Sequence, residues 1–271
     1  MNSLCLLVID PQNDFMDLAG AALPVAGAAA DMDRLAAFVQ TLQPCIDDIV
    51  VTLDSHASVG IERTSFWREA DGGPVAPFTL VTAADVRASR CAPRDHTRLP
   101  EVLAYLDALE GGSGRTLVVW PVHCVLGTWG HTIHAGLSAA VAQWEFARLR
   151  SCEKILKGLH PMTEQYSAFR AEVPRDDDVR THNNTALMAR LASASGLLVV
   201  AGEALSHCVA ASGEDMLAQL KPDRLRNTVF LTDCMSPVTG FEESGREFLA
   251  HLRSRGVRTL SSTDLAAQLA A

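Results

Sequence analysis

Short apolar runs that alternate with helical patterns are the feature that most constrains the fold. Near-continuous apolar runs of this length are typical of buried parallel strands. They lie at Leu4–Ile9, Ile49–Leu53, Thr116–Trp120, Lys154–Leu156, Leu197–Ala201, Thr228–Leu231 and Val257–Leu260. The helical patterns between them lie at Ala28–Leu42, Leu99–Leu109, Thr132–Trp144, Asn184–Ala194, Cys208–Gln219 and Glu242–Arg255. Strand and helix in alternation predict a doubly wound α/β fold, with a mostly parallel sheet of about six strands and helices on both faces.

One segment, residues 58–100, does not follow this alternation. It contains Pro74, Pro77, Pro93 and two adjacent glycines, and no period is sustained along it. Connections of this length are usually functional or disordered. We therefore expect one domain over residues 1–271 with an irregular insertion at about 58–100 that lies near the functional site or in a subunit contact, since Phe66, Trp67 and Phe78 give it apolar material to bury.

Charge and composition exclude several classes of function. The formal net charge is −9 and no basic run is present, which argues against binding to nucleic acid or to an anionic membrane surface. The N-terminal apolar stretch is too short to span a bilayer and lacks a secretion signal, so a cytoplasmic location is expected. The seven cysteines form no C-x-x-C pair and are odd in number, so most should be reduced and buried.

Polar residues at the strand ends carry the chemistry. Asp10 and Asp54 end the first two expected strands, Lys157 ends a later one, and Cys208 comes shortly after Leu197–Ala201. Because the carboxyl ends of parallel strands share one edge of a sheet, we expect a carboxylate, an ammonium and a thiol to converge there. Each residue alone has a structural explanation, as a turn cap, a solvated lysine or a buried small side chain, but together they favour catalysis.

Such a trio suits acyl transfer. A thiol becomes a good nucleophile once deprotonated, and we expect Lys157 and a helix beginning near Cys208 to lower its pKa. Asp10 is placed to accept the thiol proton and return it to a leaving amine. Backbone N–H groups of Ala204 and Cys208 are the expected oxyanion hole.

A second constellation consists of metal-ligand residue types. Asp54 and His56 stand two apart at a strand end, and His123 follows Thr116–Trp120. One carboxylate and two imidazoles with further positions open describe a catalytic or substrate-binding metal site rather than a structural one. His131 and His134 lie nearby in the sequence, and we expect them at the surface.

Together these residues resemble the nicotinamidase branch of the isochorismatase-like cysteine hydrolases. The resemblance runs from Asp10 to about Pro237. It rests on D-P-Q-N-D-F at 10–15, D-S-H at 54–56, W-P-V-H-C-V-L-G-T at 120–128, K-G at 157–158 with Y-S-A-F at 166–169, and A-G-E-A-L-S-H-C-V at 201–209.

This resemblance implies an isochorismatase-like fold and a site with assigned roles. Asp10, Lys157 and Cys208 match the catalytic triad, and Phe15 and Trp120 match an aromatic clamp on a pyridine ring. A divalent metal, zinc first and iron or manganese as alternatives, is implied on Asp54, His56 and His123, and a cis peptide is implied at Glu203–Ala204. The implied reaction is hydrolysis of nicotinamide to the acid and ammonia through a Cys208 thioester, a step of pyridine nucleotide salvage. A homo-oligomer is also implied.

Two departures leave the substrate open. No histidine follows D-S-H before His96, so Glu62 or water would complete the metal shell. Glu203-Ala204-Leu205-Ser206 replaces the Ile-Ala-Thr-Asp common in the family. A cysteine amidase for another small amide or ureido compound is therefore an alternative, and a catalytically idle binding or assembly protein is another. A dinucleotide site is disfavoured, because no G-x-G-x-x-G follows the first strand.

Overall fold

The computed structural model describes residues 3–270. Its main sheet has six parallel strands. Their order is β10-β9-β8-β1-β2-β7, and every neighbouring pair is parallel. The bounds are β1 Leu4–Ile9, β2 Ile46–Asp54, β7 Glu153–Lys157, β8 Leu197–Gly202, β9 Thr228–Leu231 and β10 Arg258–Leu260. The predicted mostly parallel α/β sheet is confirmed.

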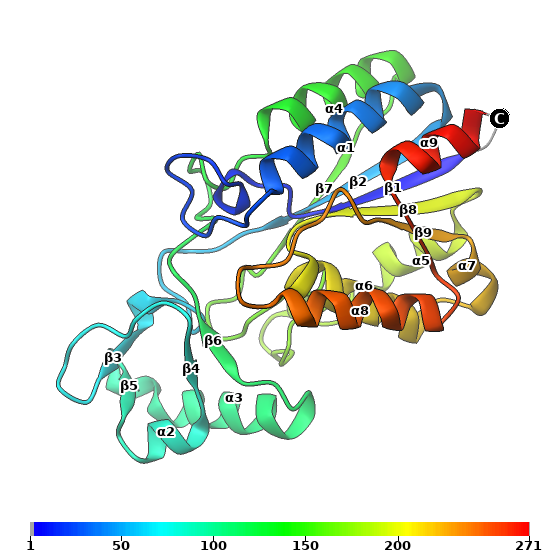
Figure 1. Ribbon diagram of the computed structural model, residues 1–271. Helices are drawn as coiled ribbons and strands as arrows, with labels where there is room; N and C mark the ends of the chain where they lie inside the picture. Colours follow the sequence, from blue (N-terminus) through cyan, green and yellow to red (C-terminus); the bar gives the residue numbers. More distant parts are fainter. Residues whose placement is uncertain (1–2, 271) are drawn as a thin grey trace.

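Helices cover both faces of this sheet (Figure 1). One face carries α1 (Ala28–Leu42), α4 (Ala135–Arg148) and α9 (Ser262–Ala270), and the other carries α5 (Thr185–Ser193), α6 (Ala210–Gln219), α7 (Pro222–Arg226) and α8 (Glu242–Ser254). Strand β1 alternates between the two cores: Leu4, Leu6 and Val8 pack into the first, and Cys5, Leu7 and Ile9 into the second. A strand buried on both faces explains the continuous apolar run, and the doubly wound arrangement is confirmed.

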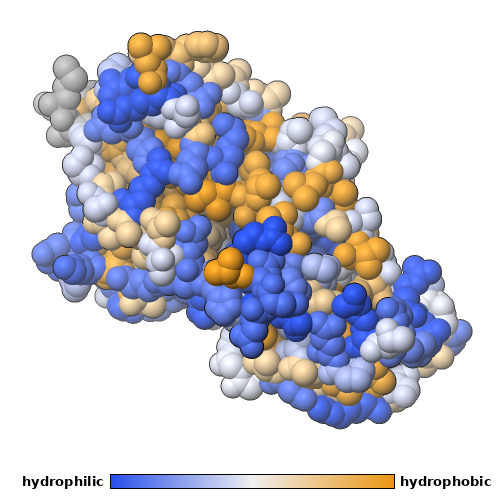
Figure 2. Space-filling view, turned by 180° about the vertical axis from the view of Figure 1, so that it is seen from behind, coloured by the Kyte–Doolittle hydropathy of each residue, from blue (hydrophilic) through white to orange (hydrophobic). Residues whose placement is uncertain are grey.

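Residues 61–119, which follow β2 and precede α4, form most of a smaller lobe, at lower left in Figure 1 and lower right in Figure 2. The lobe contains α2 (Ala83–Arg87) and α3 (Leu99–Gly112), and two antiparallel pairs: β3 (Trp67–Glu69) with β5 (Cys91–Pro93), and β4 (Thr79–Val81) with β6 (Leu117–Val119). The segment 58–100 thus has more regular structure than its sequence suggested. The prediction that Thr116–Trp120 joins the parallel sheet was wrong, because β6 pairs with β4 instead; an apolar run does not specify its partner.

The lobe has a hydrophobic core of its own. Phe66 and Trp67 are buried in it together with Tyr105 and Leu106 of α3. Phe78, expected to be buried there, is 49% exposed and packs edge-on against Trp120 at 5.7 Å between ring centroids. Within residues 3–270, no helix is both long and apolar enough to cross a membrane.

The sheet brings the chemically important residues to one edge. Asp10 follows β1, Asp54 ends β2, Lys157 ends β7 and Glu203 follows β8. These four strands are neighbours in the sheet, and the register pairs Asp54 directly with Lys157. The candidate site therefore lies at the carboxyl ends of adjacent parallel strands, where ligands of open α/β sheets bind.

Candidate active site

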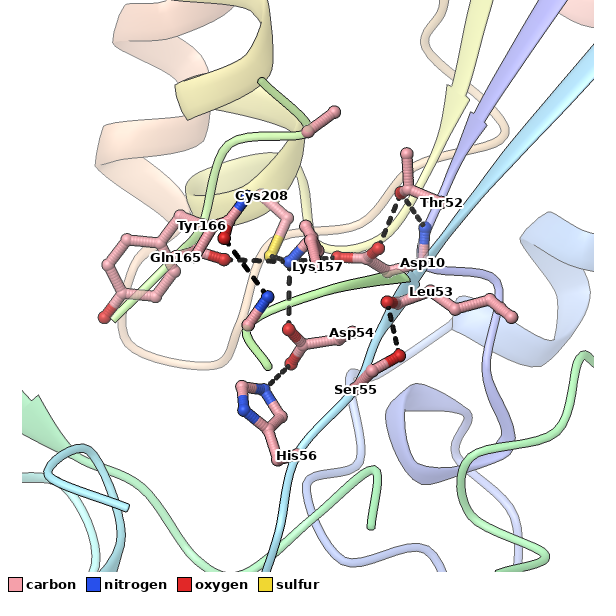
Figure 3. A network of polar contacts seen from close by, with 12 residues as sticks. Asp10, Thr52, Leu53, Asp54, Ser55, His56, Lys157, Gln165, Tyr166 and Cys208 are labelled. Carbon is pink, nitrogen blue, oxygen red and sulfur yellow. Dashed lines mark hydrogen bonds and ion pairs between the residues drawn. The ribbon is translucent and has the colours of Figure 1, made fainter. Parts of the chain in front are cut away.

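Lys157 lies at the centre of a buried polar network (Figure 3). Its Nζ is 2.8 Å from Oδ2 of Asp10 and 3.4 Å from Sγ of Cys208. The same ammonium donates to Oδ1 of Asp54 and to the carbonyl of Gln165, both at 3.0 Å. The structure thus brings together all three residues predicted as the catalytic trio, and it adds Asp54 to their network.

Asp10 is held rigidly at the end of β1. Its backbone N–H donates to Thr52 at 3.1 Å, and the Thr52 hydroxyl donates to Oδ1 of Asp10 at 2.6 Å. The carboxyl is fully buried, and burial raises its pKa; the nearby Asp54 carboxylate acts in the same direction, while Lys157 opposes both. A raised pKa makes Asp10 a stronger base for the thiol proton.

Cys208 lies in a wide helical turn, Leu205–Val209, that leads into α6. Burial raises the pKa of its thiol well above the ordinary value, although Lys157 acts to lower it. Lys157 thus lowers this pKa as expected, but desolvation of the buried thiolate outweighs its effect. The thiol keeps its proton until a base accepts it, so Asp10 becomes the more important partner.

The backbone beside Cys208 has the features of an oxyanion hole. The Glu203–Ala204 peptide is cis, as the family resemblance implied. Within the described part of the chain, the N–H of Ala204 has no hydrogen-bond acceptor. Ala204 and Cys208 also line one pocket. A buried donor free to bind an incoming oxygen is what a tetrahedral intermediate needs.

The pocket at Cys208 has aromatic walls. Phe15 and Trp120, the expected clamp, both line it. So do two residues within the quoted motifs to which the sequence had assigned no role, Tyr166 and His207. The Trp120 ring lies 5.0 Å from His207 between centroids, and its Nε1 donates to the Tyr166 hydroxyl at 3.0 Å. The pocket therefore suits a flat, uncharged ring.

One acidic residue of the pocket lining was missed entirely. Glu164 is buried, and burial together with the Glu62 charge raises its pKa to about 7. It lies in the irregular run between Lys157 and Tyr166, where neither a period nor a motif distinguishes it.

Both histidines expected to bind metal contact Asp54, but the close set of ligand atoms around it contains His123 and not His56. Oδ2 of Asp54 is 2.7 Å from Nε2 of His56 and 3.3 Å from Nε2 of His123. Asp54 therefore joins the two constellations, since its other oxygen accepts from Lys157. Cys124 was not anticipated here: ligand atoms of Asp54, His123 and Cys124 lie within 4.8 Å of one another.

The two imidazoles of this donor set differ in how they suit a divalent ion. Burial lowers the pKa of His56 but the Asp54 carboxylate outweighs it and raises that pKa to about 9, so an ion would have to displace the His56 proton. Burial and the neighbouring Arg63 lower the pKa of His123 to about 4, and a neutral imidazole is the form that binds metals. Glu62, the substitute suggested for the missing histidine, is 3.3 Å from Nδ1 of His56, and its Oε2 is buried without a partner in residues 3–270. In metal sites, a ligating imidazole commonly donates its second ring N–H to a carboxylate.

The two neighbouring histidines lie apart from this cluster. Nε2 of His131 contacts the Ser55 hydroxyl at 2.9 Å, and its ring is half-buried. His134 is buried at the start of α4, so the expectation that it lies at the surface was wrong. The backbone N–H of His134 donates to the carbonyl of Pro11, which draws the residue inward.

Comparison with known proteins gives one sequence relative and several similar structures. No family model matches the chain. A nicotinamidase from Acinetobacter baylyi is 28% identical over 210 residues, which cover 77% of this chain and 72% of the relative.

Two solved structures illustrate the shared fold. The yeast nicotinamidase bound to the inhibitor nicotinaldehyde has a TM-score of 0.63 at 20% identity, over 95% of this chain and 99% of that one. The pyrazinamidase of Pyrococcus horikoshii in complex with zinc has a TM-score of 0.55 at 19% identity, over 96% and 99%. The chain is thus similar in sequence to a nicotinamidase, and it shares its fold with solved nicotinamidase and pyrazinamidase structures.

Proposed function

We propose that this protein is a cysteine amidohydrolase that converts nicotinamide, or a closely related pyridine carboxamide, to the acid and ammonia. The observation that carries the proposal is the buried contact of Lys157 with both Asp10 and Cys208 beneath an aromatic pocket. A nucleophile, a base and a cation occur there together, and the sequence relative at 28% identity is a nicotinamidase.

The reaction begins with transfer of the Cys208 proton to Asp10 as Sγ attacks the amide carbon. The N–H groups of Ala204 and Cys208 stabilise the oxyanion that forms, and Lys157 balances the negative charge nearby. Asp10 then returns the proton to the nitrogen, the C–N bond breaks and ammonia leaves a thioester. Water, deprotonated by Asp10, attacks the thioester; the acid leaves and the thiol regains its proton.

Asp54, His56 and His123 would hold the divalent ion, with Glu62 supporting His56 and Cys124 as an alternative ligand. Zinc is the first candidate because the donor set suits it and a structural relative carries it. When bound, the ion would fix the ring nitrogen and so place the carboxamide over Cys208. Phe15 and Trp120 would hold the ring faces.

Replacement of a metal ligand tests this assignment. His123→Ala should lower metal affinity at least about tenfold, because one of few donors is lost. Metal content after dialysis, read by elemental analysis, measures this directly, and ammonia release measures the consequence. The control is His96→Ala, an exposed histidine of the lobe. Equal metal content in both variants would refute the assignment of His123, and a loss confined to Cys124→Ala would transfer the role to that thiol.

The acid side of the pH profile should report Asp10. The base acts only when deprotonated, and its folded pKa is raised above the ordinary value of 3.8. Activity should therefore be present above this raised pKa and fall as the pH decreases through it, at a pH higher than an ordinary aspartate would give. The pH dependence of kcat/KM measures it. A profile that stays flat down to about pH 4 would argue against Asp10 as the base.

Ammonia release from nicotinamide by the purified protein tests the function itself. A panel of small amides and ureido compounds, assayed with and without chelator, separates the alternatives. Activity confined to pyridine carboxamides and lost with chelator supports the proposal. Activity confined to other amides favours the broader amidase, and a lack of release from every amide leaves the binding or assembly protein.

A further inference from the structure

Glu203 is a buried acid directly before the oxyanion-hole residue, and the pocket walls do not include it. Its side chain is fully buried while Ala204, the next residue, lines the pocket. Oε2 of Glu203 accepts from the backbone N–H of Ser236 at 3.1 Å. Oε1 meets no hydrogen-bond partner in the described part of the chain. The carboxyl thus binds a loop behind the pocket rather than a ligand.

That loop is joined to α1 through Asp31. The Ser236 hydroxyl donates to Oδ2 of Asp31 at 2.6 Å, and Arg34 pairs with the other oxygen of Asp31. Arg34 also donates to the carbonyl of Asp233. Glu203, Ser236 and Asp31 therefore connect the end of β8, the loop after β9 and helix α1.

The same loop holds the backbone around Ala204. Gly202 donates to the carbonyl of Cys234 at 3.0 Å, and Leu205 donates to that of Ser236 at 2.8 Å. These bonds flank Ala204 on both sides, and the Glu203 carboxyl adds a third link between them. Any shift of the loop would therefore move the N–H of Ala204.

The charge state of Glu203 suits this role. Burial and the neighbouring Asp31 carboxylate raise the pKa of Glu203 well above its ordinary value. A neutral carboxyl offers one donor and one acceptor. It then accepts from Ser236 through Oε2, and Oε1, which has no partner as an acceptor, can donate its proton to the Asp31 side chain. Ionised, it would bring a second buried anion beside Asp31, where a single half-exposed Arg34 is the balancing cation.

We propose that Glu203 is a positioning residue that fixes the N–H of Ala204 in the oxyanion hole by holding its backbone against the loop at Ser236. This inference rests on the proposed amidase function. It assigns a role to the residue by which the chain departs most clearly from its family near the nucleophile. The expected consequence is selective: transition-state binding depends on Glu203, and ground-state binding does not.

Two substitutions at Glu203 test the inference. Glu203→Gln keeps the shape, one donor and one acceptor, so its kcat for nicotinamide should stay within about twofold of wild type. Glu203→Ala removes the link, and its kcat should fall about tenfold or more with little change in KM, since a misplaced donor costs part of the value of an oxyanion contact. Nicotinaldehyde reacts with the thiol to give an adduct that carries an oxyanion, so it should bind more weakly to Glu203→Ala than to wild type. Nicotinate forms no such adduct and should bind equally well to both.

The outcomes separate this inference from the proposed function. An active wild type with an unchanged Glu203→Ala overturns the inference alone, and so does a parallel loss of kcat, aldehyde binding and nicotinate binding. A wild type that neither releases ammonia nor binds the aldehyde overturns the proposed function, and the inference with it. If Glu203→Ala does not fold, Asp31→Asn loosens the same link from α1: a fall in kcat at constant KM supports the inference, and an unchanged kcat overturns it.

Discussion

Replacement of Cys208 by alanine is expected to abolish ammonia release, with a loss in kcat/KM of about 10⁴-fold or more. The thiol supplies the bond that replaces the amide C–N bond, and the other residues of the site only assist that step. Stability should change little, because alanine removes a single buried sulfur. Ammonia release over a range of nicotinamide concentrations and a urea unfolding curve measure the two effects separately.

Cys152→Ala is the matched control for this experiment. Cys152 is also buried, but it lies just before β7, in the core on the opposite side of the sheet from Cys208. It should keep full activity. Activity that survives in Cys208→Ala would rule out the thioester route, and equal losses in both variants would show that the effect comes from packing.

The convergence of Asp10, Lys157 and Cys208 was predictable from the sequence because it depends only on the order of parallel strands. An apolar run shows where a strand ends, and the βαβ rule places all such ends on one edge. Asp54 could be anticipated in the same way. Its double role could not: contact with Lys157 through one oxygen and with two histidines through the other follows from side-chain geometry.

The features that were missed depend on distant contacts or on burial. The pairing of β6 with β4 requires the whole lobe to fold, and short helices such as α2 and α7 have too few turns to show a period. The raised pKa of Cys208 is a balance between burial and a cation, and only the structure shows that burial prevails. The link from Glu203 to Asp31 joins residues far apart in the sequence, which no local pattern indicates.

Replacement of Lys157 by methionine is expected to reduce both stability and activity. Lys157 is the buried cation between Asp10 and Asp54, so its loss leaves two buried carboxylates without their shared partner. Removal of one member of such a network costs about 3–5 kcal/mol of the free energy of unfolding. The loss in kcat/KM should be about a hundred- to a thousandfold, because the charge that develops in the transition state is no longer balanced.

Lys154→Met is the control for this substitution, since Lys154 lies on the same strand with its side chain 44% exposed. Its free energy of unfolding should stay within about 0.5 kcal/mol of wild type.

The loss of unfolding free energy in Lys157→Met should also shrink as the pH falls. Without the cation, burial raises the carboxyl pKa values of Asp10 and Asp54, so their protonation at lower pH removes the cost of two buried charges. Urea unfolding at several pH values measures both effects. A deficit no larger than that of Lys154→Met, or one that does not depend on pH, would mean that the two carboxyls are already neutral in the native protein. A neutral Asp10 cannot accept the thiol proton, so another base would have to do so.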